Sequence, residues 1–189
     1  MSSLLVKNCR AFIANSFIET DILIENGIIS TIKPRGLKGD ERFDAHGMIV
    51  SPGLIDPHVH LREPGATYKE DFVTGTRAAI AGGFSCVMDM PNNKLPTTTK
   101  ARLEEKIKLA NEKALCDVLF HFGGTDDNFA EVTNAKPNSM KIYMGHTTGD
   151  LFLRKPDSLE HHFSNFPKNN RIVLDVWDKI GRASCRERV

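Results

Sequence analysis

The stretch GLIDPHVHLREPG, residues 53–65, places Asp56, His58, His60 and Arg62 at every second position. Alternate side chains of an extended strand point to the same face, so a strand that continues to Arg62 directs all four side chains into one cavity. Imidazole nitrogens and carboxylate oxygens are ligands for divalent metals. The spacing therefore makes metal binding the first hypothesis for this segment.

Around this stretch, short apolar runs alternate with helical patterns at a period of about thirty residues. The expected strands lie at 49–60, 84–91, 116–125, 139–145 and 171–176, and the expected helices at 72–83, 99–114, 127–135 and 156–166. This alternation predicts an α/β fold with successive βα units on a parallel sheet. A closed (β/α)₈ barrel takes about 250 residues, so segment 51–179 is expected to be an incomplete TIM barrel of about the first four to five units.

The first fifty residues follow a different pattern, with strand-like runs at 4–13, 17–34 and 41–50. The dipeptide Asn26-Gly27 inside the second run is a strong signal for a two-residue hairpin turn. Residues 1–50 are therefore expected to form a small β subdomain.

Composition narrows the class of ligand. The chain has 189 residues, of which 40% are hydrophobic and 26% charged, and its formal net charge is +1. No basic stripe with interleaved aromatic residues points to nucleic acid or to an anionic membrane, so a small-molecule substrate is the better expectation. Because no run is long enough for a spanning helix and the amino terminus lacks a secretory pattern, we expect a cytoplasmic protein.

Polar residues gather in the loops that follow the expected strands, HLREPG, MPNNKLP, GGT and MGHTTG. In βα folds these loops build the active site. Judged by the residues alone, the pair His58 and His60 fits two ordinary loop histidines as well as it fits two metal ligands. Judged in the same way, Lys141 is better interpreted as a lysine that caps a strand end than as a metal ligand.

Three segments carry a specific family resemblance: PGLIDPHVHLREPG, KEDFVTGTRAAIAGGFSCVMDMPN and MKIYMGHTTGDL. Together they closely resemble the dihydroorotases of the cyclic amidohydrolase superfamily, over about residues 48–153, and the first fifty residues resemble part of the β-sandwich subdomain of those enzymes. The resemblance implies a zinc-dependent hydrolase that reversibly interconverts L-dihydroorotate and N-carbamoyl-L-aspartate in pyrimidine (UMP) biosynthesis. It also implies two Zn²⁺ ions in each active site and a homo-oligomeric enzyme, with aspartate transcarbamoylase as a candidate partner.

The resemblance assigns roles to five residues. His58 and His60 match two ligands of the more buried metal, and Lys141 matches a lysine that is carboxylated in many relatives and bridges the two ions; some relatives use an aspartate instead. Arg62 and Asn92 match the residues that hold the substrate carboxylate, the alternatives being a surface salt bridge and a turn-forming asparagine.

Other chemically suggestive residues are interpreted as structural or left open. Asp56 is either a support for the metal ligands or a strand-end hydrogen-bond acceptor. His121 is expected to be a packed strand-end histidine, His146 to lie in a variable loop, and His161 and His162 to lie on an amphipathic helix. Cys86 and Cys116 are expected to be small buried residues in strands, since the four cysteines form no CxxC pair. The segment EEKIKLANEK, residues 104–113, is interpreted as a solvated helix face.

The chain departs from the family after residue 174. Two further histidine ligands and the aspartate that serves as general base in a complete enzyme find no match in DVWDKIGRASCRERV. Residues 180–189 look like the translation of a sequencing adapter and are expected to be a non-native tail, so Cys185 receives no role. We therefore expect a truncated, inactive chain whose fifth strand has an unpaired edge.

Two alternative functions remain open. Another cyclic amidohydrolase, an allantoinase or a hydantoinase, shares part of the pattern, but a substrate without a carboxylate has no use for Arg62 and Asn92. A non-catalytic dihydroorotase-like partner of aspartate transcarbamoylase is the alternative from a different class. Intact His58, His60 and Lys141 argue against it.

Overall fold

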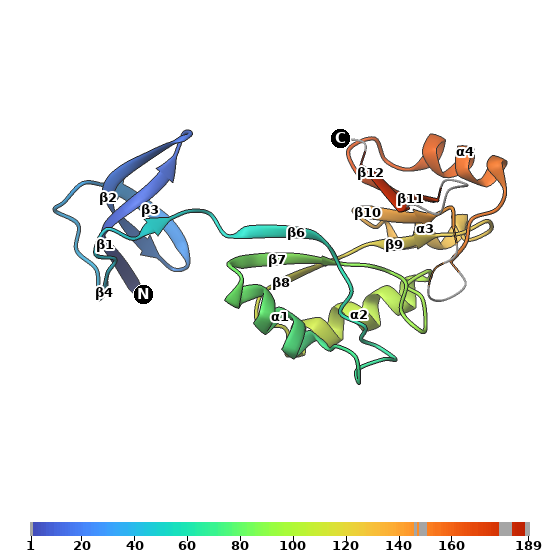
Figure 1. Cartoon of the computed structure of the whole chain (residues 1–189), viewed down its shortest axis with the longest axis horizontal. Helices are drawn as coiled ribbons and strands as arrows, with labels where there is room; N and C mark the ends of the chain where they lie inside the picture. The colour runs from blue at the N-terminus through green and yellow to red at the C-terminus, as the bar shows by residue number, and fades with distance from the viewer. Residues whose placement is uncertain (1, 146, 148–150, 178–182, 188–189) are drawn as a thin grey trace. The chain divides into compact units, whose positions relative to one another are not determined.

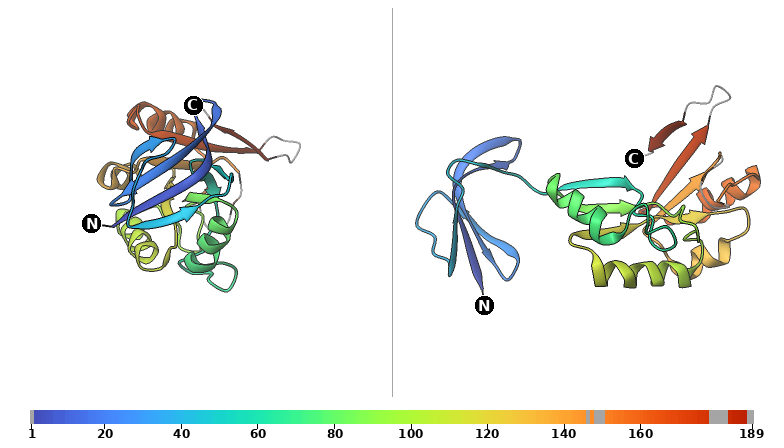
Figure 2. Two further views of the ribbon diagram at one scale, coloured as in Figure 1. Left: turned by 90° about the vertical axis from the view of Figure 1, so that its left-hand side faces the viewer. Right: turned by 60° about the horizontal axis from the view of Figure 1, so that its bottom comes forward.

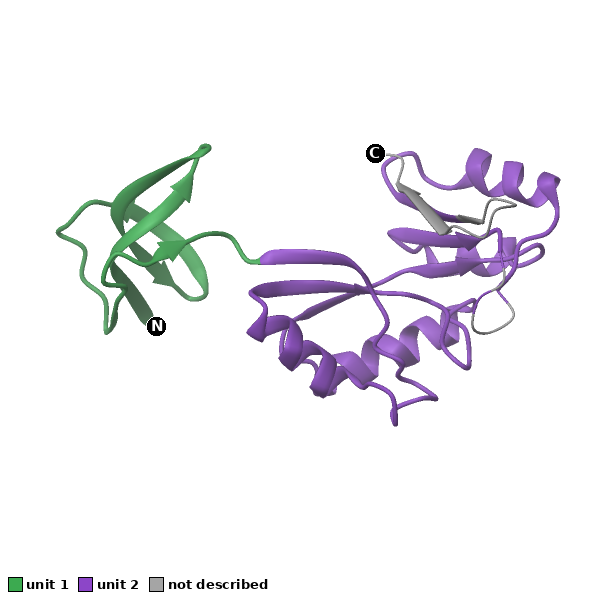
Figure 3. Ribbon diagram, in the orientation of Figure 1, with its two compact units in different colours: residues 1–53 green, residues 54–189 purple. Residues whose placement is uncertain are grey.

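The computed structural model describes residues 2–145, 147, 151–177 and 183–187, and the chain divides into two compact units, Met1–Gly53 and Leu54–Val189 (Figure 3). The division falls three residues beyond the boundary expected at residue 50. Unit 1 has one sheet and one buried cluster, and unit 2 has two sheets and two buried clusters, so each unit is described by itself.

Unit 1 is a five-stranded sheet with the order β3-β2-β1-β4, and β5 also pairs with β1. Its strands are β1 (Ser3–Ile13), β2 (Ser16–Glu25), β3 (Ile28–Lys33), β4 (Glu41–Asp44) and β5 (Ile49–Val50). The first three strands pair antiparallel, whereas β4 and β5 run parallel to β1. Cys9, Ala11, Ile22 and Ala45 form its buried core.

The predicted hairpin turn is confirmed. Strand β2 ends at Glu25 and β3 begins at Ile28, so Asn26 and Gly27 form the two-residue connection. Their φ angles are 53° and 78°, and a type I′ turn requires positive φ at both positions.

Unit 2 alternates strands and helices, and the predicted α/β class is confirmed. The elements are β6 (Leu54–Val59), α1 (Phe72–Ala81), β7 (Phe84–Asp89), α2 (Lys100–Lys113), β8 (Asp117–Phe120), β9 (Phe122–Gly124), α3 (Phe129–Ala135), β10 (Ser139–Tyr143), α4 (Pro156–Asn165), β11 (Arg171–Trp177) and β12 (Ala183–Glu187). They form two sheets, β6-β7-β8 and β12-β11-β10-β9, in which every pairing from β6 to β11 is parallel. None of the helices in the described part of the chain is long and apolar enough to cross a membrane.

The expected strand 116–125 is divided at His121. Its first part, β8, pairs with β7, and its second part, β9, pairs with β10. The His121 N–H donates to Asp89 O at 3.0 Å, where the chain leaves β7. Spatial order therefore follows chain order from β6 through β11, as it does in successive βα units.

Helices cover one face of each sheet in unit 2. Figures 1 and 2 show α1 and α2 along the β6-β7-β8 sheet and α3 and α4 beside the strands of the other sheet. Phe72 of α1 and Ala110 of α2 pack with Val87 of β7. Met140 and Ile142 of β10 pack into a separate buried cluster. Because side chains alternate along a strand, Ser139, Lys141 and Tyr143 share the opposite face of β10.

Two expectations about the strands are wrong. The edge of β11 is paired, because β12 runs antiparallel to it from Val173↔Glu187 to Trp177↔Ala183 and satisfies its backbone groups.

Cys116 lies in a bend just before β8 and is only partly buried, as is Cys86 in β7. Cys86 pairs with the exposed Asp117 near the amino ends of the strands, where solvent reaches the sheet.

Candidate active site

The strand carrying the H-x-H motif is shorter than its periodicity predicts. Strand β6 ends at Val59, and Arg62 has a φ of 59°, so the expected single strand face from Asp56 to Arg62 is wrong. Pro57 has no N–H to donate, and the pairing of β6 with β7 shifts register between Asp56 and Val59. Beyond the strand, the Leu61 N–H donates to the Asp89 side chain at 2.8 Å instead of to a backbone carbonyl.

His58 and His60 lie beside each other at this strand end. Their ring centroids are 5.4 Å apart and the ring planes make an angle of 65°. Burial is the main cause that lowers the pKa of both imidazoles, followed by the charge of Lys141 at His58 and that of Arg62 at His60. Metal binding requires the neutral imidazole, so these shifts favour the form that a metal needs.

Asp56 takes the second of its two expected roles. Its Oδ1 accepts a hydrogen bond from the His58 backbone N–H at 3.0 Å. The carboxylate thus holds the backbone that carries His58 and also opposes the lowering of the His58 pKa.

Asn92 connects His60 to a later loop. Its Oδ1 lies 2.9 Å from His60 Nδ1, and its Nδ2 donates to Thr147 Oγ1 at 3.0 Å. With Oδ1 as the acceptor, Nδ1 of His60 carries the proton and Nε2 keeps its lone pair. Asn92 therefore orients a candidate metal ligand, a role beyond the carboxylate contact predicted for it.

Lys141 is completely buried and is the third of the five residues of β10, not at the strand end as expected. Its charge lowers the pKa of His58 and of His121, which places the amine among these imidazoles. Its Nζ also lies 5.3 Å from the centroid of the Tyr143 ring. Burial disfavours the protonated form of a lysine, and only a neutral amine reacts with CO₂ to form a carbamate.

The donor set fits part of a metal centre. His58 and His60 supply two imidazoles, and a carboxylated Lys141 would add oxygen ligands. Within the described ranges, no group of three or more His, Cys, Asp and Glu side chains is placed to hold a metal ion. The residues present thus supply two or three of the four or more ligands that a zinc site requires.

Arg62 is half-buried and lies near His60. Within the part of the chain that the structure describes, no hydrogen bond or ion pair engages its side chain, although its charge acts on His60. A guanidinium near His60 that no such contact engages is available for an anionic group of a ligand.

A buried ionic cluster behind the site was missed by the sequence interpretation. Lys106 of α2 and Asp89 of β7 form an ion pair with Nζ 2.7 Å from Oδ2, and both side chains are about 1% exposed. The interpretation of residues 104–113 as a solvated helix face is therefore wrong at Lys106. The signal was present in the spacing, since Leu103, Lys106 and Ala110 stand three and four residues apart on one helix face.

The other histidines have structural surroundings. Buried His121 contacts Ser139 Oγ through Nδ1 at 2.7 Å and Pro57 O through Nε2 at 2.9 Å, as expected of a packed histidine. His161 and His162 lie on α4, as predicted. His146 lies outside the described residues.

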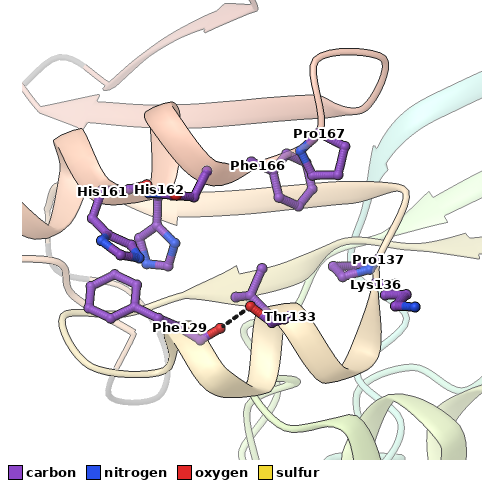
Figure 4. A pocket seen from close by; sticks show the side chains of 10 residues that line it. Phe129, Thr133, Lys136, Pro137, His161, His162, Phe166 and Pro167 are labelled. Carbon is purple, nitrogen blue, oxygen red and sulfur yellow. Dashed lines mark hydrogen bonds between the residues drawn. The ribbon is translucent and has the colours of Figure 1, made fainter.

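A cavity of about 310 Å³ lies between α3 and α4. Figure 4 shows Phe129 of α3 facing His161 and His162 of α4. The ring centroids of Phe129 and these histidines are 4.0 Å and 4.7 Å apart. None of the five residues predicted for the site lines this cavity.

Residues 49–139 match the sequence profile of the Amidohydrolase family. The chain therefore contains a domain of the amidohydrolase family. It is 40% identical over 185 residues to a dihydroorotase of Methanosphaera stadtmanae, a match that covers 95% of this chain and 41% of the relative. It is also 40% identical over 137 residues to the multifunctional protein CAD of Squalus acanthias, covering 71% of this chain and 6% of that protein.

Among solved structures, the L-hydantoinase (dihydropyrimidinase) of Arthrobacter aurescens superposes with a TM-score of 0.88 at 26% sequence identity. That match covers 95% of this chain and 42% of the hydantoinase. The chain thus spans about two fifths of the length of that dihydroorotase and of that hydantoinase.

Proposed function

We propose that this chain forms the metal-binding and carboxylate-binding part of a dihydroorotase. The observation that carries the proposal is the position of Arg62, whose guanidinium lies close enough to lower the pKa of His60 and makes no hydrogen bond within the described residues. L-Dihydroorotate carries a carboxylate on a cyclic amide, so one molecule needs both the cation and the hydrolytic centre. Identity of 40% to a named dihydroorotase supports the same conclusion.

In this proposal, unit 2 is the first half of a (β/α)₈ barrel, and unit 1 is part of a β-sandwich. The parallel order from β6 to β11 and the superposition on a hydantoinase support this architecture. The carboxyl ends of β6 and β7 then carry His60 and Asn92 on the catalytic side of the barrel.

The residues divide the work of binding and orientation. Arg62 would grip the substrate carboxylate with a planar pair of N–H donors, and Asn92 has a second Nδ2 hydrogen to offer beside its bond to Thr147. His58, His60 and carboxylated Lys141 would hold Zn²⁺, which supplies Lewis acidity and lowers the pKa of a bound water. Hydrolysis breaks the ring C–N bond, forms a C–O bond and leaves a proton on the departing nitrogen. Fixing the ring amide by its carboxylate removes orientational freedom that otherwise slows this step.

The 189-residue chain on its own is proposed to be inactive, because the residues assigned to the site include no general base for that proton. Turnover of L-dihydroorotate above that of a His58→Ala control would contradict this part of the proposal.

We further propose that the complete protein is a cytoplasmic homo-oligomer associated with aspartate transcarbamoylase. The match to a segment of a multifunctional protein supports such an association.

Ligand binding to the chain tests the proposed function directly. NMR spectra of the zinc-supplemented chain would be recorded with L-dihydroorotate and with dihydrouracil, which has the same ring without the carboxylate. We expect L-dihydroorotate to shift the signals of Arg62 and Asn92, and dihydrouracil at equal concentration to leave them in place. Equal shifts with both compounds would favour a hydantoinase. Absence of zinc uptake would favour the non-catalytic alternative.

A further inference from the structure

Among the described residues outside the proposed metal site, Lys106 is the most deeply buried cation, and three oxygen atoms surround its ammonium group. Nζ lies 2.7 Å from Asp89 Oδ2, 2.7 Å from Asn93 Oδ1 and 2.9 Å from Met90 O. Met90 O and Asn93 Oδ1 accept hydrogen bonds from this ammonium group, and Asp89 Oδ2 is its ion-pair partner. All three oxygen atoms belong to the segment that leaves the end of β7, residues 89–93. A cation of helix α2 therefore holds the first turn of a site loop.

The partners of Lys106 in turn hold the backbone on both sides of Arg62. Asp89 Oδ1 accepts from the Leu61 N–H at 2.8 Å. Asn93 Nδ2 donates to Glu63 O at 3.0 Å. Arg62 is thus fixed through the residue before it and the residue after it, and both links pass through a side chain that Lys106 holds.

Arg62 needs this restraint because of its backbone conformation. Its φ of 59° lies in the left-handed region, which is unfavourable for a residue with a side chain. Such a conformation persists only where its surroundings fix it. Asn92, which contacts His60, lies in the same held segment, so the restraint extends to the proposed metal ligand.

We propose that Lys106 is a positioning residue that directs the Arg62 guanidinium into the site through Asp89 and Asn93. The use of that guanidinium for a substrate carboxylate rests on the proposed function. The restraint on the backbone around Arg62 does not depend on the proposed function. Loss of the ammonium leaves the Asp89 carboxylate buried without its cation and frees the Asn93 side chain, so the backbone around Arg62 loses both of its anchors.

Helix α2 offers two comparison residues. Lys108 is exposed and serves as the matched control for loss of one lysine charge. Lys113 forms an ion pair with the Glu63 side chain, but its own side chain is 39% exposed. Because solvent screens that pair, we expect Lys113→Met to loosen the backbone around Arg62 less than Lys106→Met does.

Hydrogen exchange and side-chain NMR on the 189-residue chain test the restraint. In Lys106→Met we expect exchange of the Leu61 amide to accelerate at least about tenfold, while the amides of β10 keep their rates. The Arg62 Nε–H signal should change from that of an ordered side chain to that of a mobile one. Lys108→Met should match the unsubstituted chain. Unchanged exchange at Leu61, or equal acceleration throughout the chain, would overturn the proposal.

A second variant removes only one of the two links to the backbone around Arg62. Asn93→Leu keeps the Lys106–Asp89 pair but breaks the link to Glu63 O. We expect exchange at Glu63 and Ala66, whose N–H groups donate to Leu61 O and Arg62 O, to rise while Leu61 stays protected. This variant decides the proposal if Lys106→Met does not fold, since unchanged rates at Glu63 and Ala66 would contradict it.

Binding then separates this inference from the proposed function. The affinity of the zinc-supplemented chain for L-dihydroorotate should fall at least about tenfold in Lys106→Met and remain unchanged in Lys108→Met. If the unsubstituted chain does not bind L-dihydroorotate, the proposed function is wrong, and the exchange rate at Leu61 still decides the role of Lys106.

Discussion

His60 Nδ1 and Asn92 Oδ1 lie 2.9 Å apart, and this contact joins the H-x-H strand end to the loop after β7. The remaining amide group of Asn92 reaches Thr147, so one side chain connects three segments of unit 2. The arrangement leaves His60 Nε2 as the ring nitrogen with a lone pair, which is the atom a metal needs.

Removal of this contact should weaken metal binding. Asn92→Ala takes away the acceptor that orients His60 and selects its tautomer, and loss of such a partner typically costs 10–100-fold in metal affinity. Titration of the chain with Zn²⁺ against a chromophoric chelator measures the change. Asn111→Ala, at an exposed position of α2, is the control. Equal affinities of Asn92→Ala and the unsubstituted chain would show that the contact does not prepare His60 for a metal.

The charge of Arg62 should be detectable in the titration of His60. After burial, Arg62 is the next cause that lowers the His60 pKa. In Arg62→Gln the imidazolium form no longer faces a nearby cation, so the pKa of His60 should rise. NMR titration of the His60 ring protons measures it, with Arg77→Gln on the exposed face of α1 as the control. A fall, or no change, would mean that the guanidinium lies elsewhere in solution.

Substrate binding should depend on the shape of the Arg62 side chain as well as on its charge. Arg62→Lys keeps the charge but loses the planar pair of donors, so binding of L-dihydroorotate should weaken by about 1.5–3 kcal/mol. Calorimetry measures the binding, and elemental analysis should show unchanged zinc content. A variant that lost zinc instead would assign Arg62 to support of the metal ligands and reopen the hydantoinase and allantoinase alternatives.

Stability should decrease in acid because of buried neutral histidines. Burial lowers the folded-state pKa of His121, so below about pH 6.5 the unfolded chain binds a proton that the folded chain does not. The free energy of unfolding therefore falls as pH is lowered through this range, by up to about 1.4 kcal/mol for each pKa unit of difference. In His121→Gln, the free energy of unfolding measured with urea should depend less on pH between pH 7 and pH 5. His161 is exposed, so His161→Gln should leave this pH dependence unchanged. An unaltered slope in His121→Gln would show that His121 does not contribute.

Close packing at Gly123 should make it intolerant of a side chain. A Cβ at this position would lie 2.7 Å from Leu151 Cδ2 and 3.1 Å from Thr98 Cγ2. Leu151 is completely buried, so Gly123→Ala should reduce the free energy of unfolding by about 1–3 kcal/mol. Gly82→Ala, whose nearest contact would be 3.4 Å, should cost less. Similar urea midpoints for the two variants would contradict the packing seen here.

Local patterns along the chain predicted the elements of both units. The turn at Asn26-Gly27 follows from the positive φ that these residues adopt readily, and the alternation after residue 50 follows from side-chain periodicity. His58, His60 and Arg62 could be named as site candidates from their alternate spacing, whereas Asn92 was named through the resemblance to the dihydroorotases.

Tertiary contacts decided how those candidates are arranged. Strand β6 ends at Val59 because Leu61 finds an acceptor in the Asp89 side chain, 28 residues away, so the strand periodicity does not reach Arg62. Sequence spacing carries no information about such a partner.

The sequence by itself determined the α/β order, the hairpin of unit 1 and the residue types available for chemistry, because these depend on neighbours a few residues apart. Only the tertiary structure decided that β12 covers the edge of β11 and that Lys106 is buried against Asp89. It likewise decided that the Asn92 amide orients His60. Each of these depends on groups far apart in the chain, whose partners are chosen by packing and by the need to satisfy buried polar atoms.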